Sequence, residues 1–287
     1  MFENPQASEP VQAPDSLIGE ADPPPVEVVN EGGAAKVILT CDHASAAMPA
    51  ALGTLGLDPA ELGRHICYDI GIAEVGRALC EMLDAPLVLA GYSRLVIDVN
   101  RRLDDPTLIS VISDGAIVPG NRNITNEDKA RRIENIYRPY HQTIDRLSGE
   151  LMERGVAPAI ISLHSFTTSL NRYDRPWHFG ILWRRDPRIA VPLMERLGAN
   201  AGICVGDNQP YSGGNDHGIS IESHAESRGL PHALIEIRQD LVAADAGAED
   251  WAGRLAGVLD DVLDDPGVGD YTTPAPDISE PRFEQLI

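Results

Sequence analysis

Basic residues are scarce in this 287-residue sequence. Its 23 lysines and arginines stand against 44 aspartates and glutamates, which gives a formal net charge of −21. A field of that sign repels phosphate backbones and anionic lipid, so we expect neither nucleic acid nor a membrane as a partner. A small anionic substrate would need a local basic pocket. The stretch 94–138 is a candidate because its bases and acids nearly balance, although a mixed-charge solvated surface explains part of that composition.

The sequence also lacks the marks of secretion and of membrane insertion. None of its four cysteines forms a C-x-x-C pair, and each lies in an apolar stretch. Buried free thiols are therefore expected, which suits a reducing compartment. The chain has no run of 18 apolar residues, and its N-terminal segment has neither a basic region nor an apolar one. We expect a cytoplasmic protein with no membrane-spanning helix.

Two common catalytic signatures are missing. The sequence contains no G-x-G-x-x-G and no G-K-[ST], so Gly213 and Gly214 do not belong to a phosphate loop. It contains no nucleophile elbow either, which argues against a serine hydrolase.

Both ends of the chain differ in composition from its middle. Residues 1–33 hold acids, no bases and a Pro-Pro-Pro run. Such a segment buries too little apolar surface to offset its ordering entropy, so we predict a disordered tail. Residues 267–287 are similarly acidic and aperiodic and are predicted to form a second tail. The region 34–266 is predicted to be one catalytic domain.

Short apolar runs alternate with helical patterns through that domain, which predicts an α/β fold. We expect three α/β/α layers around a mixed, largely parallel sheet. The expected strands are 36–41, 86–91, 94–99, 159–164, 178–183 and 232–238, and the expected helices are 70–83, 125–153, 188–198, 219–228 and 247–264. Within 125–153, Thr125 and Asp128 resemble a capping box, and Pro139 is expected to kink the helix rather than end it.

Polar clusters follow four of the expected strands. They are Cys41–Ser45, Asp98–Arg102, Leu163–Phe166 and Ile235–Arg238. Ligands of open α/β sheets bind at the carboxyl ends of the strands, so the four clusters together indicate one site.

Three residues in these clusters suit the hydrolysis of an amide. Zinc with three protein ligands and an open position lowers the pKa of water to ~7 and polarises a carbonyl, and a nearby carboxylate can move the proton. His43 and His164 are the natural ligands, and Glu236 is the natural base. Each has an alternative explanation: either histidine could be a hydrogen-bonded structural residue, and Glu236 could form a buried ion pair with Arg238 or another arginine.

Nine segments between residues 41 and 240 make the chain resemble the N-formylglutamate amidohydrolase family, which is itself similar to the zinc carboxypeptidases. The resemblance implies a zinc-carboxypeptidase-like (phosphorylase/hydrolase-like) fold. It implies zinc-dependent hydrolysis of a small, anionic N-acylated amino acid to the free amino acid and formate, in amino-acid catabolism. The segments are CDHASAAMP, CYDIG, YSRLVIDVNRR, VPGN, RPYH, SLHSFT, RPWHFGILW, GDNQPYSGG and IEIRQD.

The resemblance also implies roles for single residues. His43 and His164 resemble the zinc histidines, and Glu236 resembles the catalytic glutamate. Asn100 and Arg101 resemble a pair that grips a substrate carboxylate, although Arg101 could instead pair with an aspartate at the strand end. Arg94 resembles, more loosely, a catalytic arginine that steadies the oxyanion.

The sequence departs from the carboxypeptidase pattern at one ligand. Those enzymes place an acidic ligand three residues after the first histidine, where this chain has Ala46. We predict Asp69 as the third ligand, with Asp42 as the fallback. The alternative for Asp69 is an N-cap of the helix that follows it.

Three further residues are predicted to contact substrate. Arg175 and His178 lie together in RPWHFGILW, and His178 has an alternative role in supporting the site. Tyr211 lies in a glycine-rich segment that suits a pocket lid, although the same glycines suit a simple turn.

Two other functions stay open. One is a deacylase or peptidase acting on a different substrate. The other is a binding protein that kept the pocket but lost the metal, a hypothesis to which Ala46 gives weight.

Overall fold

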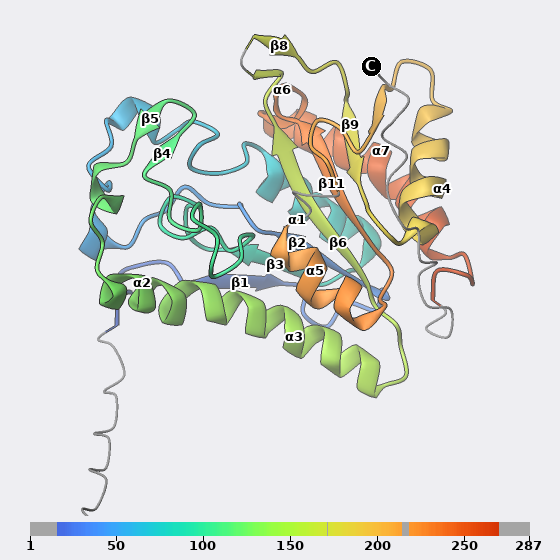
Figure 1. Cartoon of the computed structure of the whole chain (residues 1–287). Helices are drawn as coiled ribbons and strands as arrows, with labels where there is room; N and C mark the ends of the chain where they lie inside the picture. The colour runs from blue at the N-terminus through green and yellow to red at the C-terminus, as the bar shows by residue number, and fades with distance from the viewer. Residues whose placement is uncertain (1–15, 171, 214–217, 270–287) are drawn as a thin grey trace, which may run out of the picture.

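A computed structural model describes residues 16–170, 172–213 and 218–269 of the chain. Its centre is a seven-stranded sheet in the order β1-β3-β2-β6-β11-β9-β10 (Figure 1). The strands are β1 (Val26–Val29), β2 (Val37–Cys41), β3 (Leu87–Ala90), β6 (Ala159–Phe166), β9 (Phe179–Leu182), β10 (Val205–Asp207) and β11 (His232–Arg238). Two small hairpins lie outside the sheet: β4 (Ile112–Ser113) with β5 (Ala116–Ile117), and β7 (Ser169–Leu170) with β8 (Tyr173–Asp174).

The four central strands run parallel. β3 pairs with β2, β2 with β6, and β6 with β11, all in the same direction. β9 is antiparallel to β11, β10 is parallel to β9, and β1 is antiparallel to β3. Every residue of β2 and β6 is buried, as expected of parallel strands covered on both faces. The carboxyl ends of the four central strands therefore meet at one edge of the sheet.

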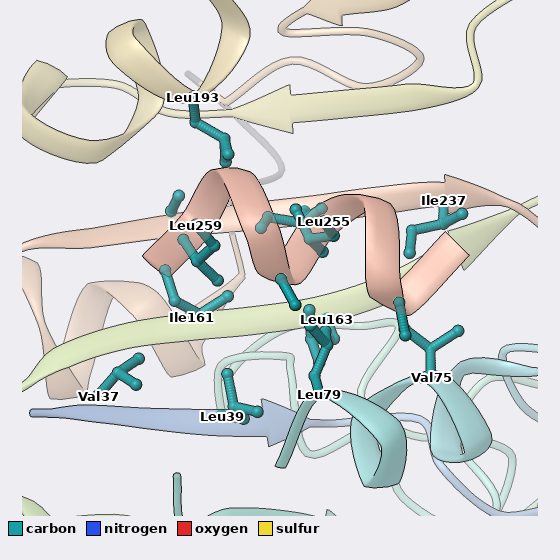
Figure 2. Packing of buried hydrophobic residues seen from close by; sticks show 14 of the residues in the cluster. Val37, Leu39, Val75, Leu79, Ile161, Leu163, Leu193, Ile237, Leu255 and Leu259 are labelled. Carbon is teal, nitrogen blue, oxygen red and sulfur yellow. The ribbon is translucent and has the colours of Figure 1, made fainter. Parts of the chain in front are cut away.

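Helices cover both faces of the sheet, so the predicted three-layer α/β/α fold is confirmed (Figure 1). One face carries α1 (Ile72–Leu83), α4 (Pro187–Gly198), the short α6 (Gln239–Val242) and α7 (Asp245–Leu263). The other face carries α3 (Arg138–Glu153) and α5 (Ile219–His224). Figure 2 shows the first face, where leucines of α1, α4 and α7 pack against aliphatic side chains of β2, β6 and β11. None of the described helices is both long and apolar enough to cross a membrane.

The predicted helix 125–153 is continuous in direction but changes its winding. It consists of α2 (Asn126–Arg132), a π-helical turn (Ile133–Tyr137) and α3. The capping box is present, since Thr125 Oγ1 accepts from the Asp128 amide at 3.1 Å and Asp128 Oδ2 accepts from the Thr125 amide at 3.2 Å. Pro139 lies in the first turn of α3. The π-helical turn just before it leaves room for a residue that has no N–H to donate, so the chain stays helical through Pro139 and does not end there.

The predicted strand 94–99 is wrong, because this segment is a series of turns. The amide of Val96 donates to the Ser93 carbonyl at 2.9 Å, and the amide of Asp98 donates to the Leu108 carbonyl at 2.8 Å. The apolar residues of the segment are buried with side chains of α3, on the other face of the sheet from α1 and α7, and do not join a sheet. A short apolar run reports burial, and burial alone does not distinguish a strand from a packed turn.

The predicted disordered tail 1–33 is wrong for its second half, and the ordered domain begins before residue 34. Val26 pairs with Ala90 as β1 joins the edge of β3, and Leu17 is buried. The Tyr92 hydroxyl donates to the Pro23 carbonyl. Backbone pairing and a few apolar contacts offset the ordering entropy that composition alone suggested was prohibitive. Residues 1–15 and 270–287 lie outside the described residues.

Helix α1 begins at a glycine whose backbone conformation and surroundings leave no room for a side chain. Gly71 occupies its N-cap with φ 77°, and among the described residues no side chain caps this helix. A Cβ added at Gly71 would overlap the Val242 carbonyl oxygen. The chain therefore needs glycine here to enter α1 from the turn that holds Asp69.

We expect Gly71→Ala to lower the free energy of unfolding by at least about 2 kcal/mol, because the left-handed conformation and the overlap both disfavour a Cβ. Gly149→Ala is the matched control: Gly149 lies within α3, and a Cβ there meets no atom within 4 Å. It should raise stability by ~0.5–1 kcal/mol. Urea unfolding of both variants measures the difference, and equal stabilities would contradict the constraint at Gly71.

Candidate metal centre

Three side chains converge at the carboxyl edge of the sheet. His43 follows β2, His164 lies in β6, and Asp69 lies in the turn before α1. One possible ligand atom of each lies within 4.8 Å of the others, and all three residues are buried. The Asp69 amide donates to the His43 carbonyl at 2.9 Å, which holds the turn against the end of β2.

The ring of His43 is oriented by a buried carboxylate. His43 Nε2 lies 2.7 Å from Asp98 Oδ1. An ionised carboxylate only accepts, so this contact assigns the ring proton to Nε2. His43 Nδ1 then carries a lone pair, lies 3.5 Å from Asp69 Oδ2, and has no hydrogen-bond partner among the described residues.

His164 is oriented in the same way by a different carboxylate. Its Nε2 lies 3.1 Å from Asp42 Oδ2, and its Nδ1 lies 2.9 Å from Asp69 Oδ2. Asp42 is therefore on the far side of the imidazole ring from Asp69. This geometry removes Asp42, the fallback ligand, from the point where the other groups converge.

The electrostatics of the cluster favour a cation. Burial lowers the pKa of His164, but hydrogen bonds to Asp42 and Asp69 outweigh burial and raise that pKa to about 10. Burial raises the pKa of Asp69, but Arg94 and the two histidines hold it well below the usual range. The cluster thus binds positive charge in some form, a proton or a metal ion. Two imidazole nitrogens, one of them the unpartnered Nδ1 of His43, and one carboxylate oxygen fit a zinc ion with an open fourth position.

Asp69 does not cap α1, which was its alternative role. Gly71 takes the N-cap position, and the Asp69 carboxylate faces the site instead. Asp69 Oδ1 bonds the Arg94 guanidinium, and Oδ2 accepts from the Ser165 amide at 3.3 Å. Its role as a metal ligand stays a prediction, with the geometry in its favour.

A cavity of about 250 Å³ opens over the cluster and brings together most of the predicted site residues. Two lining residues, Ser165 and Leu234, were not predicted. The others were all singled out from the sequence: His43, Asp69, Arg94, Asn100, Arg101, His164, Tyr211 and Glu236.

Glu236 lies beside His164, because the two residues are paired in register between β11 and β6. Its Oε2 has no hydrogen-bond partner in the described part of the chain, and burial raises its pKa to about 7. The alternative ion pair with Arg238 is absent there, since Arg238 Nε instead donates to Asp240 Oδ1 at 2.8 Å. An unpaired carboxylate of raised pKa in a cavity suits proton transfer.

Asn100 and Arg101 line the same cavity from the turns that follow Asp98 rather than from a strand. Asn100 Oδ1 accepts from the Ser220 amide at 3.1 Å, which assigns the other end of the side chain as the NH2 group, and this group bonds to none of the described residues. Arg101 Nε is 3.9 Å from Asp98 Oδ2, too far for a hydrogen bond, and its side chain is 38% exposed. Asp104 contacts Arg102 rather than Arg101. The geometry leaves donors of both residues available to an anion.

Arg175 and His178 differ from the prediction. Arg175 lies behind the cavity wall, where its Nη1 donates to the Tyr211 hydroxyl at 3.2 Å and its guanidinium lies over the Tyr211 ring. His178 lies away from the cavity: it stacks on Trp251 of α7, and its Nδ1 accepts from the Cys204 amide at 2.8 Å. His178 was predicted to contact substrate, and this is corrected: it is a packing residue, because Trp251 covers its ring and the Cys204 amide occupies its Nδ1.

Asp98 and Asp42 were not predicted to be the partners of the two histidines. Asp98 opens the D-x-N-R motif and Asp42 precedes His43, so both lie in motifs that were noticed. Which histidine each carboxylate faces depends on the packing of β2, β6 and the 93–101 turns. Burial raises the pKa of Asp98, but His43 outweighs it and lowers that pKa to about 2, consistent with a permanently ionised partner.

Comparison with known proteins identifies chains of similar fold and sequence. A gene product from Agrobacterium tumefaciens (Atu2144) has a similar crystal structure, with a TM-score of 0.83 and 32% identity over 86% of this chain and 98% of that one. The N-formylglutamate amidohydrolase from Ralstonia eutropha JMP134 shares the fold, with a TM-score of 0.66 and 22% identity over 83% of this chain and 97% of that one. No curated protein matches. The family model for N-formylglutamate amidohydrolase matches residues 35–243. The chain therefore belongs to the N-formylglutamate amidohydrolase family.

Proposed function

We propose that this protein is a zinc-dependent amidohydrolase that cleaves a small N-acylated amino acid, N-formylglutamate-like, to the free amino acid and formate. Membership of the family supports amide hydrolysis. The observation that carries the proposal is the convergence of His43, Asp69 and His164 in one cavity with the unpartnered Glu236. A zinc ion held by the first three residues would lower the pKa of water and polarise the substrate carbonyl.

The chain's own residues supply the remaining chemistry. Glu236 Oε2 accepts a proton from water and returns it to the leaving amine. The Arg94 guanidinium, beside Asp69, provides positive charge where the carbonyl oxygen becomes negative. The NH2 group of Asn100 and the guanidinium of Arg101 hold the substrate carboxylate, and Tyr211 closes the wall. These roles place a carboxylate-bearing substrate between the clamp and the metal centre.

The size of the cavity favours a small substrate over a peptide. A volume of about 250 Å³ suits a single acylated amino acid. We propose a cytoplasmic enzyme with no nucleic-acid or membrane partner. A hydrolysis screen of zinc-loaded protein against N-formyl, N-acetyl and N-carbamoyl amino acids and dipeptides tests the substrate. Turnover of dipeptides alone would favour a peptidase, and zinc-free protein with no turnover would favour a binding protein.

His43→Ala and Asp69→Asn are each expected to remove most of the bound zinc, because each deletes one of three ligands. His178→Ala is the matched control, since His178 packs on Trp251 away from the cavity and should keep full zinc. Metal analysis of the dialysed proteins measures the outcome. Full zinc occupancy in both ligand variants would overturn the assignment.

Glu236→Gln should keep zinc and lower kcat by ~10²–10⁴-fold, because the amide has the shape of the carboxylate but cannot accept the proton. In the wild type, kcat/KM should fall as pH decreases and Glu236 gains a proton. Its pKa of about 7 applies without a metal, and the charge of zinc moves this limb to lower pH. A pH profile of both proteins measures the limb. An unchanged kcat would show that Glu236 is structural.

Arg101→Lys is expected to lower kcat/KM by ~10–100-fold, mainly through KM, because a lysine cannot form two parallel bonds to a carboxylate. Arg138→Lys is the control, since Arg138 pairs only with Glu134 on the surface of α3 among the described residues. Kinetics with a carboxylate substrate and its amide analogue measure the preference. If the variant loses stability but keeps the carboxylate preference, Arg101 is not the clamp.

A further inference from the structure

Asp42 is the most completely bonded carboxylate near the metal centre. It is 1% exposed. Its Oδ1 accepts from the Tyr140 hydroxyl at 2.6 Å and from the Ser220 hydroxyl at 2.8 Å. Its Oδ2 accepts from the Ser162 hydroxyl at 3.1 Å and lies 3.1 Å from His164 Nε2. A carboxylate offers about four acceptor positions, so Asp42 has no capacity left for a metal or a substrate.

The position of Asp42 determines which ring nitrogen of His164 is available to a metal. Asp42 and Asp69 both only accept, so without a metal each ring nitrogen of His164 donates to one carboxylate. A metal between His164 and Asp69 would replace the proton on Nδ1, while Asp42 keeps the proton on Nε2. The negative charge of Asp42 also increases the basicity of the ring. Partners of this kind commonly account for 10–100-fold of metal affinity.

Ser220 connects the same carboxylate to the substrate side of the cavity. Its hydroxyl donates to Asp42, and its backbone amide donates to Asn100 Oδ1 at 3.1 Å. Ser220 lies in the first turn of α5, whose other end is held against α3: His224 Nε2 is 2.7 Å from His141 Nδ1. The short helix α5 thus bonds both to Asp42, the carboxylate partner of His164, and to Asn100, whose amide is proposed to bind substrate.

We propose that Asp42 is a positioning residue that directs His164 Nδ1 toward the metal and, through Ser220, links the metal centre to the Asn100 amide. The inference rests on the proposed function. It goes beyond that function in assigning roles to Asp42 and Ser220, neither of which touches the cavity. It predicts that metal affinity and substrate affinity both depend on the hydrogen bonds of Ser220 to Asp42 and Asn100.

Asp42→Asn is expected to weaken zinc binding by ~10–100-fold in a chelator competition, because the ring loses its anionic partner. At zinc concentrations far above the new Kd, kcat should return close to the wild-type value. Asp186→Asn is the matched control, since Asp186 is an equally buried carboxylate that caps α4. It should lower stability and leave the zinc Kd unchanged. A zinc Kd unchanged in Asp42→Asn would overturn the proposal.

A measurement on the wild-type protein keeps the proposal testable if Asp42→Asn does not fold. In protein labelled with 15N-histidine and loaded with cadmium, the metal should couple to Nδ1 of His164, and the proton should reside on Nε2. Coupling to Nε2 would overturn the proposal.

Ser220→Ala tests the link to the substrate side. It removes the hydroxyl that anchors Ser220 to Asp42 but keeps the amide that bonds Asn100. Because Asn100 is then held less firmly, KM should rise while kcat changes less. An unchanged KM would overturn the link. The two proposals can fail separately. If the wild-type protein binds no zinc, both the proposed function and the role of Asp42 are wrong. If zinc binds but its Kd is unchanged in Asp42→Asn, only the role of Asp42 is wrong.

Discussion

The site depends on one electrostatic requirement: three buried polar atoms converge on the same small volume and need positive charge among them. They are Nδ1 of His43, Nδ1 of His164 and Oδ2 of Asp69. Such a convergence is unfavourable in a buried place unless a cation lies between the groups. Each group is held there from behind by a charged partner, namely Asp98, Asp42 or Arg94. The surrounding turns and the α5 helix are arranged to hold those partners.

The fold and most of the cavity could be predicted because parallel strands carry a strong sequence signal. β2 and β6 are buried on both faces and therefore appear as uninterrupted apolar runs. Their carboxyl ends meet at one edge, so the polar residues that follow them, such as His43 and His164, had to lie near each other. Glu236 was recognisable for a similar reason, as a single acid within an apolar strand. The family resemblance then ordered these residues into one site.

Other features depend on packing that the sequence does not encode locally. The turns at 94–99 are as apolar as a strand because they are buried against α3, and the residues around β1 resemble a disordered tail because only pairing with β3 orders them. His178 shares a motif with Arg175, yet the antiparallel direction of β9 places it beside α7. The division of labour between Asp42 and Asp98 depends on which ring each carboxylate reaches, and only the three-dimensional arrangement determines that.

The edge strand β1 has a consequence for how the chain can be shortened. β1 pairs with the backbone groups along the outer side of β3. Just before β1, the Pro23 carbonyl accepts a hydrogen bond from the Tyr92 hydroxyl. A chain trimmed at residue 34, where composition suggests a domain boundary, would expose a row of unpaired amides and carbonyls on β3. Such a row is a template for the strands of other molecules, so trimming there invites intermolecular β-pairing and aggregation. Within the described residues, the segment around β1 thus covers the outer side of β3.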